Sequence, residues 1–182
     1  LGDNSYIKSA TSGDVTITVS GAGETLSLSG TSASVQAVSG NVEVTINDGD
    51  LLLTSNLSTI TASGNIDVSA NGVELSGNAS LACTGSGILT VNTDGILTAA
   101  PSTETIILNG GSYFQTASGL LRVNSTGAGT VDLALNSFIR STAGAVSVTA
   151  NDINITGHAS TPSYIRAATD VDVTTSDGDI TL

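Results

Sequence analysis

Gly40-Asn41-Val42-Glu43-Val44 is followed one repeat later by Gly64-Asn65-Ile66-Asp67-Val68, and related segments recur along the whole chain. Each copy joins a turn of small residues to a short strand in which apolar and polar residues alternate. A mean period of about 26 residues is typical of solenoid proteins. The seven copies begin at Gly13, Gly40, Gly64, Gly87, Gly119, Gly144 and Thr169.

Each repeat contains two further apolar-alternating segments, one before the turn and one after the central strand. Three short strands per repeat are therefore expected. The strands before the turn are predicted at residues 6–8, 34–36, 59–61, 80–82, 113–115, 138–140 and 164–166. The strands after the central one are predicted at residues 24–28, 50–53, 72–75, 104–108, 131–133, 152–155 and 179–182.

This pattern predicts an all-β fold, a single-chain β-solenoid of about seven coils of about 26 residues with three short strands each. Residues 1–182 form one domain in this reading, either a segment or a stacking unit of a longer fibre. The spacing between the starts of successive copies is longest from Gly87 to Gly119, and we call this interval the long step. Its extra residues, Asn92 to Thr103, are expected to form a loop outside the core. An intertwined homotrimer, in which three chains share one core, is the alternative.

Strand alternation also assigns faces, because successive side chains point to opposite sides of a sheet. The aliphatic residues of the central strands are predicted to point inward and the polar residues between them outward. The predicted inward set includes Val15, Ile17, Val42, Val44, Ile66, Val68, Val146 and Val148, and the outward set Thr16, Glu43, Asp67 and Ser147.

Composition excludes several classes of partner. The chain has 16 acidic and 4 basic residues, so its net charge is -12. Such a charge argues against binding nucleic acid or an anionic membrane surface, and no apolar run is long enough to insert into a membrane. Because 39% of the residues are hydrophobic and only 11% are charged, the chain is nevertheless expected to fold.

The strands before the turn carry the residues most suited to an interaction. All five aromatic residues lie in them, and three of the four cations follow an aromatic residue by two positions. Because Ile7, Phe114, Ile139 and Ile165 are expected to point inward, their neighbours form an external ladder that could bind a glycan, a neighbouring chain or only itself. This candidate interface or ligand ladder consists of Tyr6, Lys8, Tyr113, Gln115, Phe138, Arg140, Tyr164 and Arg166.

The acidic corners, His158 and Cys83 are the remaining candidates for a chemical site. Acidic corners at residues 47–50 and 177–179 offer oxygen ligands that could hold Ca²⁺, although turn formation explains them equally well. No catalytic residue, other metal or cofactor is predicted. His158 has no second ligand nearby in the repeat, and Cys83 is interpreted as a core thiol or a solvated thiol without a function.

The repeats contain the motifs Gly-Asn-Val-x-Val and Gly-Asp-Leu-x-Leu, as in residues 40–44 and 49–53. These motifs resemble the β-helical repeats of filamentous-haemagglutinin-type secreted adhesins and of bacteriophage or viral fibre and spike proteins. The few aromatic and lysine residues add to this likeness. The resemblance implies a rod on an extracellular, cell or virion surface, and a receptor or glycan on a host surface as a partner. It carries over no catalytic residue.

The repeat keeps its phase when residues 178–182 are written before residues 1–8, and neither end shows a capping element. The chain itself is therefore a predicted partner, through head-to-tail or lateral association. We expect a non-enzymatic structural or adhesive fibre component that stacks end to end. The alternative is a polysaccharide-binding or polysaccharide-degrading β-helix of the tailspike kind, which would need a groove with two carboxylates.

Overall fold

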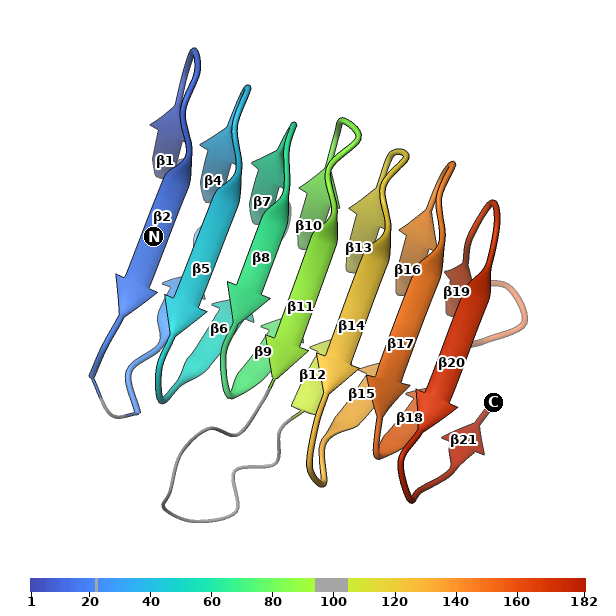
Figure 1. Cartoon of the computed structure of the whole chain (residues 1–182). Coiled ribbons are helices and arrows are strands. Elements are labelled where there is room, and N and C mark those ends of the chain that lie inside the picture. Colours follow the sequence, from blue (N-terminus) through green and yellow to red (C-terminus); the bar gives the residue numbers. More distant parts are fainter. Residues whose placement is uncertain (22, 94–104) are drawn as a thin grey trace.

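The computed structural model describes residues 1–21, 23–93 and 105–182 and arranges them in three parallel sheets (Figure 1). Each sheet takes one strand from each of the seven coils. Sheet A contains β1 (Tyr6–Ser9), β4 (Ser34–Ala37), β7 (Thr59–Ala62), β10 (Ser80–Cys83), β13 (Tyr113–Thr116), β16 (Phe138–Ser141) and β19 (Tyr164–Arg166).

Sheets B and C follow sheet A within every coil. Sheet B contains β2 (Val15–Val19), β5 (Val42–Ile46), β8 (Ile66–Ser69), β11 (Leu89–Thr93), β14 (Leu121–Ser125), β17 (Val146–Ala150) and β20 (Val171–Thr175). Sheet C contains β3 (Leu26–Leu28), β6 (Asp50–Leu53), β9 (Gly72–Leu75), β12 (Thr105–Leu108), β15 (Thr130–Leu133), β18 (Asp152–Ile155) and β21 (Ile180–Thr181).

Every strand pairs with the strand one repeat away, so a single chain closes each coil and stacks it on the next. Val42, for example, lies between Val15 and Ile66 in parallel register. The described residues contain no helix, and hence none able to cross a bilayer. The predicted single-chain β-solenoid with three strands per coil is confirmed.

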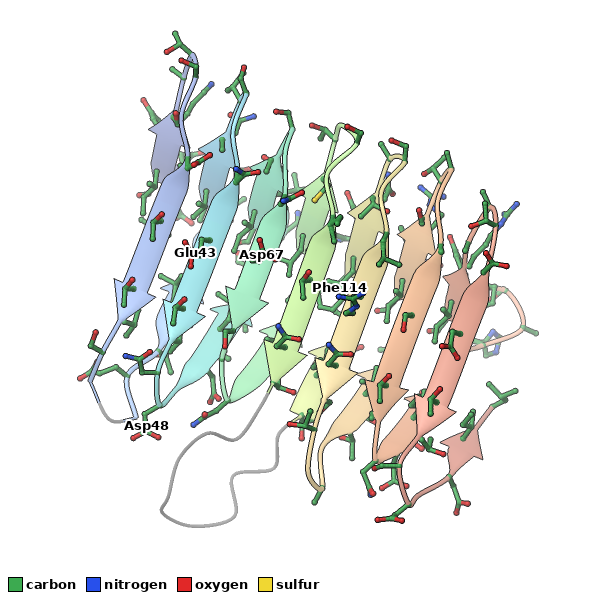
Figure 2. The ribbon with its side chains drawn as sticks, viewed as in Figure 1. Glu43, Asp48, Asp67 and Phe114 are labelled. Carbon is green, nitrogen blue, oxygen red and sulfur yellow. The ribbon has the colours of Figure 1, made fainter. Side chains whose placement is uncertain are left out.

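The core is a set of aliphatic ladders enclosed by the three sheets. Val42, Val44, Ile66 and Val68 are at most 1% exposed, whereas Glu43, between the two valines, is exposed to solvent. Figure 2 shows Glu43 and Asp67 on the outer face of sheet B and Phe114 among the inner side chains. The predicted faces are confirmed, although the inner residues of β1 and β20, in the first and last coils, are less well covered than those of the central coils.

Several hydroxyl groups inside the core are paired across coils. Thr93 Oγ1 donates to Ser125 Oγ at 3.0 Å, and Thr116 Oγ1 lies at the same distance from Ser141 Oγ. Ser141 Oγ also donates to the carbonyl oxygen of Gly119. Burying these groups is therefore not costly, since each has a hydrogen-bond partner.

The corner between sheets A and B is held by a ladder of polar side chains that accept hydrogen bonds from the next coil. Asp14 Oδ1 accepts from the backbone N–H of Asn41 at 2.7 Å, and Asn41 Oδ1 accepts from that of Asn65 at 2.7 Å. Asn65 Oδ1 continues the ladder by accepting from the N–H of Ile88. The Asp and Asn residues of the repeat thus satisfy turn amides that the sheets leave unpaired.

The long step lies between β11 and β12, at the corner between sheets B and C. The predicted loop begins too early, because Asn92 and Thr93 are the last two residues of β11 and Thr93 is fully buried in the core. The rest of the predicted insertion lies outside the described residues. On either side the solenoid is continuous, because β11 pairs with β14 and β12 pairs with β9.

Candidate functional site

Three aromatic rings on the outer face of sheet A are stacked. Tyr113, Phe138 and Tyr164 begin three neighbouring strands, in register. The ring centroids of Tyr113 and Phe138 are 4.7 Å apart, those of Phe138 and Tyr164 are 5.2 Å apart, and both interplanar angles are 4°. The predicted external aromatic ladder of coils five to seven is confirmed, and its spacing follows the distance between parallel strands.

A polar row runs beside these rings, two residues further along the same strands. Arg140 Nη2 donates to Gln115 Oε1 at 2.7 Å, and the Arg140 guanidinium lies 5.1 Å from the centre of the Phe138 ring. Arg166 follows Arg140 in register on β19. Six of the eight predicted residues therefore form one continuous surface, which we call the ladder surface: Tyr113, Gln115, Phe138, Arg140, Tyr164 and Arg166.

The other two predicted residues lie at the opposite end of sheet A. Tyr6 is 70% exposed and pairs with Ser34, and Lys8 pairs with Gln36, so neither meets another aromatic or cationic member of the set. The repeat predicts this separation, because it places Tyr6 and Lys8 in the first coil and the other six residues in coils five to seven. Tyr6 joins the ladder surface only if a second copy stacks on the last coil.

The last coil leaves its inner aliphatic side chains uncovered. Val171 is 48% exposed, Ile180 47% and Leu182 91%, although equivalent residues in the central coils are buried. An open apolar hollow of about 390 Å³ results. It is lined by Ile155, Ser163, Tyr164, Ile165, Val171, Val173, Ile180 and Leu182. Sequence reasoning anticipated an open end but not this hollow.

The remaining candidates do not gather into a site. Within the part of the chain that the structure describes, no group of three or more His, Cys, Asp or Glu residues is placed to hold a metal ion. His158 lies in an exposed loop, where its Nδ1 is 2.9 Å from Ser160 Oγ. Cys83 is buried, and this burial raises the pKa of its thiol to about 11, so the thiol stays protonated at neutral pH.

One acidic hollow was missed by the sequence analysis. Asp50 and Glu74 border a shallow space of about 150 Å³ on the outer face of sheet C, beside Gly72. The space exists because Gly72 has no side chain in the row that it shares with Asp50. Only knowledge of the register between β6 and β9 brings these two carboxylates together.

Comparisons with protein-family models, with curated proteins and with solved structures found no match to this chain.

Proposed function

We propose that this chain is a rigid structural or adhesive fibre component that associates end to end, with the first coil of a second copy covering the last coil of the first. The observation that carries the proposal is the uncovered aliphatic interior of the last coil. Exposed apolar surface and unpaired strand edges both favour association, and parallel strands supply the geometry for it.

The two ends match position by position in all three sheets. Continuing the observed register places Tyr6, Ile7 and Lys8 of the second copy beside Tyr164, Ile165 and Arg166. In sheet B, Val15 and Ile17 would lie beside Val171 and Val173, and in sheet C, Leu26 would lie beside Ile180. Aliphatic residues thus meet aliphatic residues at these inner positions, and the Tyr6 ring would extend the aromatic stack.

Three features oppose the contact, and the two that involve charge make it depend on salt. Leu1 already lies over Leu28, with its amino group donating to Ser27 O, so Leu182 must turn aside when a second copy occupies that level. Lys8 would also lie beside Arg166, and each chain carries a net charge of -12. Association should therefore strengthen as salt screens these repulsions.

An extracellular or virion-surface location and a non-enzymatic role complete the proposal. The resemblance of the repeats to secreted adhesins and viral fibres supports this location and role. The described residues also form solenoid coils throughout, which supports a structural role. A polysaccharide-binding or polysaccharide-degrading β-helix is the second candidate, favoured by the Asp50 and Glu74 carboxylates beside one hollow. Release of reducing sugar that is lost in an Asp50→Asn or Glu74→Gln variant would favour this second candidate instead.

The association is tested by placing a charge at each end separately. Ile165→Asp should abolish stacking on the last coil, and Ile7→Asp should abolish stacking on the first coil. In each variant, association would bury an unpaired carboxylate between the two copies, which is strongly unfavourable. Each variant alone is expected to sediment as a monomer, whereas the wild type forms larger species. An equimolar mixture should recover a dimer, since one intact end of each kind remains.

Thr174→Asp is the matched control, because Thr174 is an exposed residue on the outer face of the last coil. It should associate like the wild type. A wild-type chain that stays monomeric at high concentration and high salt would contradict the proposal, as would a mixture of the two end variants that yields no dimer.

A further inference from the structure

Arg140 and Arg166 form a cationic pair that the fold leaves without a counter-ion. They occupy neighbouring register positions on β16 and β19, so their backbones are separated by one strand spacing, about 4.8 Å. Neither forms an ion pair with a described carboxylate. Half of the chain's four cationic side chains are thus placed side by side in a protein with 16 acidic residues.

Hydrogen bonding within the chain does not satisfy this pair. Arg140 donates from Nη2 to the neutral Gln115 side chain, but its Nε is buried and has no hydrogen-bond partner. Arg166 makes no hydrogen bond to any residue in the described ranges. Like charges one strand apart repel, and an unpaired buried donor costs free energy, so both features favour an anion that accepts from the two guanidinium groups.

Space for such an anion is present next to the pair. A hollow of about 190 Å³ is bounded by Arg140, Arg166 and Thr142, together with Ala167 and Ala168. The two alanines follow Arg166 directly, and their small side chains leave the space open. The hydroxyl of the exposed Thr142 adds a neutral hydrogen-bonding group to the rim.

We propose that this hollow is a carboxylate-binding site, and that its ligand is a carboxylate attached to a ring, as in an acidic sugar. A planar carboxylate matches the fork of guanidinium N–H donors, and two adjacent arginines can hold its two oxygens. The hollow is lined by residues that follow the arginines, whereas Phe138 and Tyr164 lie two residues before them on the same face, so an acidic oligomer that extends past the guanidinium groups would reach the aromatic ladder. The site does not depend on end-to-end association.

Calorimetric titration with a galacturonate hexamer tests the site, with a neutral glucose hexamer as the comparison. The acidic oligomer should bind and the neutral one should not, and affinity should fall as salt is raised. Arg166→Gln should weaken binding by about tenfold or more, because it removes a charge-assisted pair from an exposed position without disturbing the core.

Arg122→Gln is the control, since Arg122 is exposed on sheet B and its loss changes the net charge equally. It should leave the affinity within about twofold of the wild type. Equal losses in both variants, or no binding of the acidic oligomer, would overturn the proposal. If Arg166→Gln reduced self-association while the galacturonate hexamer failed to bind, the carboxylates would come from another copy and the proposal would be wrong. Binding by a strictly monomeric chain would uphold it even if the fibre proposal failed.

Discussion

Replacing Phe114 with alanine is expected to lower the free energy of unfolding by about 3–5 kcal/mol. Phe114 is fully buried, and it is the largest side chain of the solenoid core. It lies between Leu81 and Ile139 in register, so its removal leaves a cavity beside two rigid ladders that cannot collapse onto it. Denaturant unfolding followed by circular dichroism measures the effect.

Tyr113→Ala is the matched control, because Tyr113 precedes Phe114 on the same strand but points outward. Tyr113→Ala should lower the free energy of unfolding by less than Phe114→Ala does. It removes one stacking contact with Phe138, worth about 1 kcal/mol, and leaves no cavity in the core. Equal losses in the two variants would show that the assignment of inner and outer faces on β13 is wrong.

Gly87→Ala should destabilise the fold by about 1–3 kcal/mol, although it adds only one methyl group. A Cβ at Gly87 would overlap the backbone carbonyl oxygen of Gly64 in the coil below, and backbone cannot rotate away as a side chain can. The same close approach recurs at Gly119, whose Cβ would overlap the carbonyl oxygen of Gly87. Gly87 and Gly119 thus allow neighbouring coils to approach closely at this corner.

Gly2→Ala is the comparison for this substitution, because a Cβ at Gly2 has no heavy atom within 4 Å. Its unfolding midpoint should stay at or slightly above that of the wild type, since alanine reduces the freedom of the unfolded chain. A Gly87→Ala variant as stable as Gly2→Ala would mean that neighbouring coils lie further apart at this corner than the structure shows.

The architecture was predictable because one local rule is repeated in every coil. Alternation in segments such as residues 42–44 and 66–68 fixes both the strand and its inner face, and a constant period aligns equivalent residues in neighbouring coils. The stacking of Tyr113, Phe138 and Tyr164 follows from the same rule. In a solenoid, residues separated by one sequence period lie side by side in neighbouring coils, so the period predicts which residues are in contact.

The features that sequence reasoning missed depend on pairs of residues that no single repeat contains. The hollow beside Arg140 and Arg166 exists because Ala167 and Ala168 are small, and the acidic hollow exists because Gly72 follows Asp50 in register. The buried Arg140 Nε depends on how the neighbouring coils cover the guanidinium. Such details need side-chain positions from adjacent coils.

A disulfide between copies can show whether the chains associate end to end in a defined register. If β20 of one copy pairs with β2 of the next, Asp172 lies beside Thr16, as Ser147 lies beside Asp172 within the chain. Parallel neighbours about 4.8 Å apart are within the range that a disulfide spans. The buried, protonated Cys83 should not compete.

The measurement is mild oxidation of a mixture of Asp172→Cys and Thr16→Cys chains, with the products identified by mass spectrometry. If the chains stack end to end in this register, a covalent dimer containing one chain of each kind is expected. A mixture of Asp172→Cys and Thr18→Cys should yield far less, because Thr18 would pair with Thr174 and lie about 8 Å from residue 172, beyond disulfide reach. Equal yields from the two mixtures, or no mixed dimer in the first, would contradict end-to-end stacking in this register.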